Sequence, residues 1–228
     1  MSRLTCFAHR GASGYEPENT LRSFRRAIDM GCRWIELDVY AVDGELLVIH
    51  DDDLSRTTDG RGKVSTSTFD YLRSLDAGKG ERIPTLAEVF EMVDRRCGIN
   101  IELKGHGTAR PVSSFLAEQL ARGWDTQQVI LSSFDHRELA LTDPSYPRGA
   151  LCGRSISYAK IHELAASSLN IPLRLANEAT IESAHAENLR VYVYTVNQPS
   201  DIRRMMAIGV DGVFSDYPDR VLAQANED

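Results

Sequence analysis

The feature that most constrains the fold is a repeated alternation of short apolar runs with amphipathic segments along the chain. Short apolar runs bounded by polar or turn residues are typical of buried strands. Eight such runs are present: Leu4–Ala8, Trp34–Tyr40, Ile99–Leu103, Val129–Ser132, Gly149–Cys152, Ser168–Ile171, Val191–Thr195 and Val210–Phe214. Eight strands with intervening helices in 228 residues predict an α/β fold, the (β/α)8 TIM barrel. A doubly wound parallel sheet is the alternative, but this chain lacks a glycine-rich first turn.

Capping residues indicate where the predicted helices begin and end. The first helix is expected to follow Asn19 or Thr20 as its N-cap and to end at Gly31. Three later helices are expected to open at residue pairs that contain proline: Pro84-Thr85, Pro199-Ser200 and Tyr217-Pro218. Since no repeat, low-complexity tract or linker interrupts the series, we expect residues 1–228 to form a single domain.

One long segment departs from the regular alternation. Asp43-Gly44 is a hairpin signal, so Trp34–Tyr40 should fold back antiparallel onto Glu45–His50. The residues that follow are rich in Thr, Ser, Asp and Gly. We therefore expect a small insertion after strand two, at about residues 42–83, lying over the barrel mouth where active sites of such barrels are found.

Ionisable residues gather at the predicted carboxyl ends of the first strands. Residues two apart in a strand face the same side, so the motifs IELD and IELK each place two of them together. Glu36, Asp38 and Glu102 would repel one another if crowded and unpaired, and an oxygen-only ligand set favours Mg²⁺ or Ca²⁺ over zinc. Seven residues are expected at this mouth: His9, Arg10, Glu36, Asp38, His50, Glu102 and Lys104. The cationic Arg10 and Lys104 beside a metal favour an anionic substrate group, most simply phosphate.

Other titratable residues have simpler interpretations. His162 and His185 lie in helical patterns and are expected to face solvent, whereas His106 and His136 follow strand ends and are weaker candidates for the mouth. The acidic run Asp51–Asp53 is expected to cap and solvate the insertion.

The composition limits which binding partners and which cellular compartment we expect for this protein. A formal net charge of −7 argues against nucleic acid or an anionic membrane surface as the main partner. The four cysteines stand far apart with no C-x-x-C pair, which is typical of reduced thiols. The N-terminal apolar run is too short for a signal peptide, and no run is long enough to span a membrane. We expect a cytoplasmic globular protein without stable membrane association, and a homo-oligomer is compatible with this sequence.

The chain resembles the glycerophosphodiester phosphodiesterase family, in its bacterial, cytoplasmic form. The similar motifs are HRGASGYEPENT, IELDVYAVDGELLVIHDDDLSRTT and IELK, with VYVYTVN and GVDGVFSDYP near the end. The resemblance extends from His9 to about Pro218. By position it implies that Glu36, Asp38 and Glu102 bind the metal, that His9 and His50 are the acid–base pair, and that Arg10 and Lys104 contact the phosphate. Tyr194 stands where the family often has a tryptophan near the substrate glycerol, and Ser215 where threonine is common.

The implied reaction is metal-dependent hydrolysis of glycerophosphodiesters, such as glycerophosphocholine and glycerophosphoethanolamine, to glycerol 3-phosphate and an alcohol. One histidine would take a proton from water, or from the neighbouring glycerol hydroxyl if a cyclic phosphate forms. The other would protonate the departing alkoxide. Three alternatives remain: a lysophospholipase D-like enzyme or other phosphodiesterase that uses the same site, an aldolase with Lys104 as its Schiff-base amine, and a catalytically inactive binding module. The aldolase would leave the three carboxylates without a purpose.

The hairpin register makes a further prediction about His50. With a two-residue turn, His50 would lie opposite Leu37 and face away from the carboxylates, because opposed residues share a face. We therefore expect a three-residue loop, Val42-Asp43-Gly44, with a positive φ at Gly44 and His50 opposite Glu36.

Overall fold

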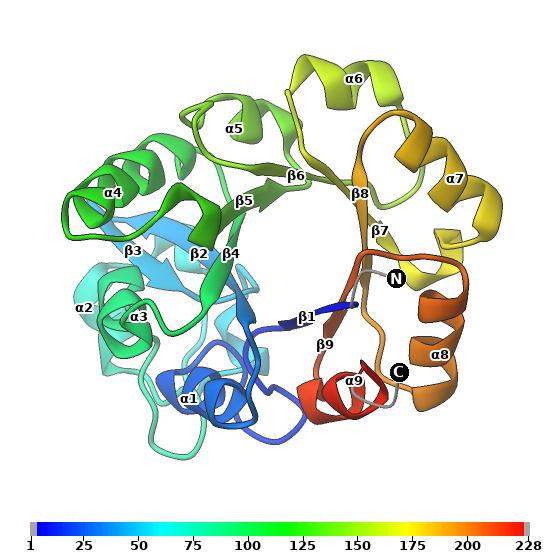
Figure 1. Cartoon of the computed structure of the whole chain (residues 1–228). Coiled ribbons are helices and arrows are strands. Elements are labelled where there is room, and N and C mark those ends of the chain that lie inside the picture. Colours follow the sequence, from blue (N-terminus) through cyan, green and yellow to red (C-terminus); the bar gives the residue numbers. More distant parts are fainter. Residues whose placement is uncertain (1–3, 226–228) are drawn as a thin grey trace.

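Eight parallel strands close into a barrel in the computed structural model, which describes residues 4–225 (Figure 1). The barrel strands follow the order β1-β9-β8-β7-β6-β5-β4-β2, and β2 pairs with β1 to complete the ring. Their bounds are β1 Thr5–Ala8, β2 Trp34–Val42, β4 Gly98–Leu103, β5 Val129–Ser133, β6 Arg148–Leu151, β7 Ser168–Pro172, β8 Arg190–Tyr194 and β9 Gly212–Ser215. The predicted (β/α)8 barrel is thus confirmed, with strand ends shifted by up to two residues. Residues 1–3 and 226–228 of the expected domain lie outside the described residues.

Helices cover the outside of the barrel (Figure 1). They are α1 Leu21–Asp29, α3 Leu86–Val93, α4 Ala109–Ala121, α5 His136–Ala140, α6 Tyr158–Glu163, α7 Glu178–Ala186, α8 Pro199–Ala207 and α9 Pro218–Ala225. Thr20 and Thr85 each form a capping box, in which the threonine side chain and the side chain three residues later bind each other's backbone N–H groups. Pro199 and Pro218 begin α8 and α9, as expected.

A cluster with three aromatic rings lies inside the barrel. Phe7, Ile130, Tyr192 and Phe214 form a buried cluster of their own, and the Phe7 and Phe214 rings stack with centroids 4.8 Å apart. Since β5 does not neighbour β1, β8 or β9, these side chains can meet only inside the barrel.

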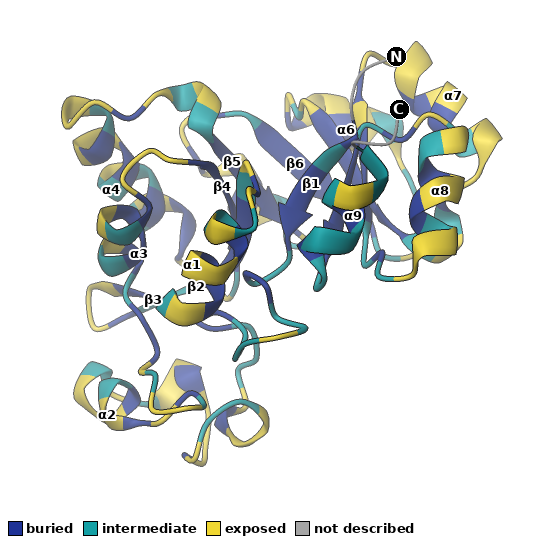
Figure 2. Cartoon of the chain, turned by 60° about the horizontal axis from the view of Figure 1, so that its bottom comes forward, coloured by how far each residue is buried: buried dark blue, intermediate teal, exposed yellow. Residues whose placement is uncertain are grey.

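The segment between β2 and α3 forms the expected insertion. It contains β3 (Glu45–Val48), α2 (Phe69–Ser74) and two short 3₁₀ turns, Leu54–Arg56 and Val64–Thr66. It also has a small apolar core, made of Val42, Leu47, Ile49, Leu54, Val64, Leu72, Leu75, Ala77 and Ile83. Figure 2 shows α2 and its neighbours projecting beyond β3.

The hairpin register differs from the prediction. Val42 lies opposite Glu45, so the loop is the two-residue turn Asp43-Gly44 and the three-residue loop is wrong. The positive φ at Gly44 is confirmed at 84°, but Asp43 also has a positive φ of 51°, as a type I′ turn requires. Asp43 is supported in this conformation by its Oδ2, which accepts a hydrogen bond from the Phe69 N–H at 2.9 Å.

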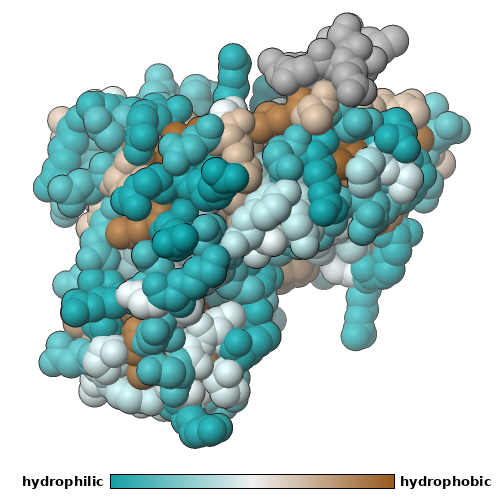
Figure 3. All heavy atoms as spheres, turned by 90° about the horizontal axis from the view of Figure 1, so that it is seen from below, coloured by the Kyte–Doolittle hydropathy of each residue, from teal (hydrophilic) through white to brown (hydrophobic). Residues whose placement is uncertain are grey.

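Much of the surface is polar. The face in Figure 3 is mostly hydrophilic, with small scattered apolar patches. Among the described helices, none combines the length and the apolar character needed to cross a bilayer.

Candidate active site

A cavity of about 190 Å³ opens at the carboxyl ends of the barrel strands. Six of the predicted site residues line it: His9, Arg10, Glu36, His50, Glu102 and Tyr194. Asp38 and Lys104 lie against these residues, because Lys104 Nζ is 2.8 Å from Glu102 Oε1 and Arg10 Nε is 3.5 Å from Asp38 Oδ2. A larger hollow of about 510 Å³ lies at the opposite end of the barrel, but no carboxylate or imidazole is among its described lining residues.

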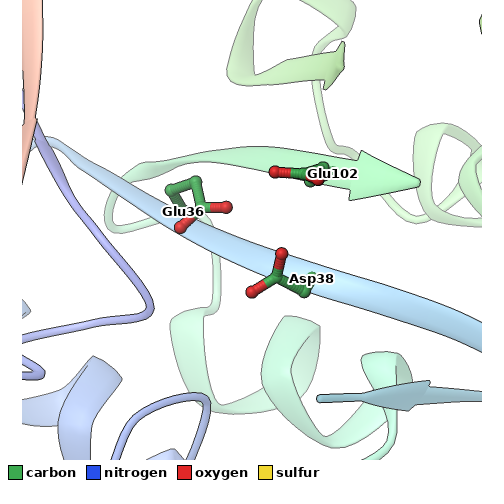
Figure 4. Close-up of side chains that lie close together, drawn as sticks. All are labelled: Glu36, Asp38 and Glu102. Atoms are coloured by element: carbon green, nitrogen blue, oxygen red, sulfur yellow. The ribbon is translucent and has the colours of Figure 1, made fainter. Parts of the chain in front are cut away.

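Three buried carboxylates form the centre of the site (Figure 4). Glu36 and Asp38 alternate along β2, and Asp38 lies beside Glu102 in the pairing of β2 with β4. One oxygen from each carboxylate lies within 4.8 Å of the other two. The side chains of Glu36, Asp38 and Glu102 can therefore share one cation.

Burial and mutual repulsion shift the pKa values of these three carboxylates unequally. Burial, with the charge of Asp38, raises the pKa of Glu36 to about 8, and the same two causes raise the pKa of Glu102. Burial also disfavours ionised Asp38, but the charges of Lys104 and Arg10 outweigh it and hold its pKa below the ordinary value. The cluster therefore favours an additional positive charge.

One oxygen of the cluster accepts no hydrogen bond, although Lys104 Nζ lies 3.7 Å from it. Asp38 Oδ1 is buried and has no hydrogen-bond partner, whereas Asp38 Oδ2 accepts a hydrogen bond from Asn19 Nδ2 at 2.8 Å. Anionic oxygen donors suit Mg²⁺ and Ca²⁺. The donor set is thus compatible with a divalent metal ion.

The loop after β1 is shaped to bring Arg10 to the carboxylates. Arg10 and Gly11 have positive φ values of 55° and 81°, and the Arg10 N–H donates to Glu36 Oε2 at 2.9 Å. A Cβ on Gly11 would lie 2.4 Å from Ser23 Oγ, so both the backbone angle and the space require glycine. This explains the HRG sequence at the end of the first strand.

Each candidate histidine is held by a carboxylate at Nδ1. His9 Nδ1 is 2.7 Å from Asp216 Oδ1, and His50 Nδ1 is 2.6 Å from Asp51 Oδ1. In both rings Nε2 is the nitrogen left to exchange a proton with a substrate. Burial lowers the pKa of His9, but the hydrogen bond to Asp216 and the charge of Glu36 outweigh it and the pKa is raised. For His50, burial prevails over the charge of Asp38 and the pKa is lowered.

His50 reaches the cavity although the hairpin register counts it opposite Leu37. β3 ends at Val48, and the chain bends at His50 after the Ile49 N–H donates to the Asp38 carbonyl at 3.0 Å. The strand pairing therefore does not decide the direction of this ring.

Sequence reasoning missed Asp216 and the role of Asp51. Asp216 follows β9 directly, so the rule that collected the other strand-end residues could have identified it. Asp53 caps the turn Leu54–Arg56 and Asp52 binds the Ser65 N–H, as expected of the acidic run, but Asp51 holds His50 instead.

The remaining histidines do not line the cavity. His162 and His185 are solvent-accessible and pair with Glu187 and Asp211. His106 is exposed, and His136 Nε2 lies 3.0 Å from the Leu151 carbonyl.

Tyr194 and Ser215 have different surroundings. The Tyr194 hydroxyl is buried without a hydrogen-bond partner, and its ring packs edge-to-face on Phe134, with centroids 5.9 Å apart. Ser215 is fully buried and donates to Asn197 Oδ1, so it does not face the cavity.

Comparison with known proteins finds relatives and solved structures that match nearly the whole chain. A glycerophosphodiester phosphodiesterase of Caldanaerobacter subterraneus is 35% identical, over 94% of this chain and 95% of the relative. One of Bacillus altitudinis is 35% identical, over 95% of this chain and 96% of the relative. Among solved structures, an Oleispira antarctica phosphodiesterase in complex with the product sn-glycerol-3-phosphate has a TM-score of 0.90 at 32% identity, covering 98% of this chain and 97% of that chain. The model of the glycerophosphoryl diester phosphodiesterase family matches residues 9–220, and the chain belongs to this family.

Proposed function

We propose that this chain hydrolyses glycerophosphodiesters, such as glycerophosphocholine and glycerophosphoethanolamine, to sn-glycerol 3-phosphate and an alcohol in a metal-dependent reaction. The observation that carries the proposal is the convergence of two carboxylate-held imidazoles and the three-carboxylate cluster on one cavity. The complex of the Oleispira antarctica phosphodiesterase with sn-glycerol-3-phosphate supports the choice of substrate class.

Glu36, Asp38 and Glu102 would hold the cation, either Mg²⁺ or Ca²⁺. When bound, the cation supplies Lewis-acid stabilisation of charge on the phosphodiester. Arg10 and Lys104 add positive charge for the phosphate, since both lie against the acidic cluster. Tyr194 lines the cavity and is proposed to contact the substrate.

His9 and His50 would exchange protons through Nε2. One takes a proton from the nucleophile, which is water or the neighbouring glycerol hydroxyl, and the other protonates the departing alkoxide. Because an alkoxide has a high pKa, such acid–base assistance contributes about 10²–10⁴-fold to the rate.

The structure argues against Schiff-base chemistry at Lys104. Burial disfavours its charged form, but Glu102 and Asp38 outweigh this and raise the pKa of the amine. A persistently protonated amine is a poor nucleophile. An aldolase of this type is therefore not supported.

The test is release of glycerol 3-phosphate from several glycerophosphodiesters, with and without EDTA. We expect release without chelator, loss of most activity in EDTA, and recovery on adding Mg²⁺ or Ca²⁺. Full activity in EDTA would contradict the metal assignment, and no release from any glycerophosphodiester would contradict the substrate class.

A further inference from the structure

Two glutamates in the loop after β1 each bind two cationic side chains. Glu16 binds Arg22 and Lys79, at 2.5 and 2.7 Å. Glu18, two residues later, binds other cations through similar contacts. The two side chains are similarly shielded, with 15% and 19% exposure. Glu16 and Glu18 differ in the other residues that their cationic partners contact.

The two arginines that bind Glu18 both connect to the active site. Arg10 Nη1 lies 2.8 Å from Glu18 Oε1, and Arg10 lines the cavity. Arg56 donates to both oxygens of Glu18 at 2.8 Å and also donates, through Nε, to Asp51 Oδ2. Asp51 Oδ1 in turn lies 2.6 Å from His50 Nδ1. Side-chain contacts thus connect Arg10 to His50 through Glu18, Arg56 and Asp51.

These side-chain contacts orient the His50 ring, which the strand pairing does not do. His50 lies beyond the end of β3, in a bend, so the ladder of backbone hydrogen bonds does not hold its ring. Arg56, by contrast, lies in a 3₁₀ turn that is anchored by the fully buried Leu54 and capped by Asp53. The insertion therefore holds the backbone of Arg56 in place. Arg56 in turn positions Asp51, which orients the His50 imidazole.

We propose that Glu18 is a positioning residue that sets Arg10 and the His50 ring in one arrangement, acting on His50 through Arg56 and Asp51. This inference rests on the proposed function, since it takes His50 as an acid–base residue. With Asp51 accepting the Nδ1 proton, Nε2 keeps one tautomer and one direction. Small misplacements of a reacting group are costly in rate, so loosening the ring lowers turnover.

The test compares Glu18→Gln with the matched control Glu16→Gln. Both changes remove one charge and two ion pairs from the same loop, but Arg22 and Lys79 make no described contact with a predicted site residue. We expect Glu18→Gln to lower kcat by about 10–100-fold and to raise KM, because Arg10 loses its ion pair with Glu18 too. Glu16→Gln should keep wild-type kcat and KM, with a similar change in melting temperature.

A second variant, Arg56→Gln, cuts the path to His50 but leaves the pair of Glu18 with Arg10. It should lower kcat with little change in KM, and Arg56 is exposed enough for the variant to fold. The Glu18→Gln/Asp51→Asn double variant should have a kcat no lower than that of the more impaired single variant, because both changes affect kcat through the same ring. The Nδ1 proton of His50, followed by NMR, should persist in Glu16→Gln and broaden in Glu18→Gln.

The possible failures are separable. If His50→Ala retains wild-type turnover, the acid–base role in the proposed function is wrong. If His50→Ala is inactive while Glu18→Gln and Arg56→Gln match Glu16→Gln, the positioning role is wrong and the proposed function stands.

Discussion

The acidic cluster should make the metal-free protein less stable as the pH rises, and Glu36→Gln should remove much of this dependence. Glu36 is 3% exposed, and burial with the neighbouring charge of Asp38 raises its pKa from 4.5 to about 8. Between these two values the folded state holds a proton that the unfolded state has released. Glu36 therefore stabilises the fold fully below about pH 4.5, and this contribution is lost as the pH rises to about 8.

The size of the effect follows from linkage. Within this window each pH unit removes about 1.4 kcal/mol of unfolding free energy, so about 3 kcal/mol should be lost between pH 5 and 7. For a chain of this size that loss corresponds to a fall in melting temperature of about 6–12 °C. His9, whose pKa is also raised, contributes in the same direction. Because the charge of Glu36 is one cause of that rise, Glu36→Gln should remove the contribution of Glu36 and part of that of His9.

The assay is thermal unfolding in EDTA from pH 5 to pH 8, for the wild type and Glu36→Gln. The glutamine carbonyl can still accept the hydrogen bond that Glu36 Oε2 receives from the Arg10 N–H, so the variant changes mainly the charge. At pH 8, Mg²⁺ or Ca²⁺ should restore much of the melting temperature of the wild type and less of the variant's. Parallel pH curves for the two metal-free proteins would refute the argument that Glu36 is protonated by burial and repulsion.

Three further predictions concern the catalytic groups and the hairpin. His9→Ala and His50→Ala should each lose about 10²–10⁴-fold in turnover of glycerophosphocholine. Both variants should keep the metal-dependent rise in melting temperature. Wild-type rates in both would rule out the acid–base assignment. Arg10→Ala should weaken binding of the phosphate, seen as a higher KM for substrate or a higher Kd for glycerol 3-phosphate, and an unchanged affinity would argue against the contact. Gly44→Val should destabilise the protein by about 1–2 kcal/mol, because φ is 84° at this position although a Cβ would have open space. Gly44→Asn, which tolerates this angle better, should be milder, and equal stability of the two variants would contradict the strain argument.

Local patterns determined much of the fold and the composition of the site. The eight barrel strands, the caps at Thr20 and Thr85, and the common face of Glu36 and Asp38 all depend on residues close together in the chain. Strand periodicity and capping act over a few residues, so they can be read without knowing the tertiary structure. Parallel pairing of neighbouring strands then brings Asp38 beside Glu102. This neighbourhood could be predicted once the fold class was known.

Tertiary structure decided the hairpin register and the partners of the histidines. Asp43-Gly44 is compatible with turns of either length, and the conformation of Asp43 is supported by the Phe69 N–H, which lies 26 residues away. Asp216 holds His9 across a separation of 207 residues, and Arg56 reaches Glu18 across 38. Such contacts form only when the barrel closes and the insertion folds onto the first loop, because the ends of strands distant in sequence then share one mouth. The residue types at the site were therefore predictable from local pattern, whereas the orientation of its histidines depended on contacts that no local pattern encodes.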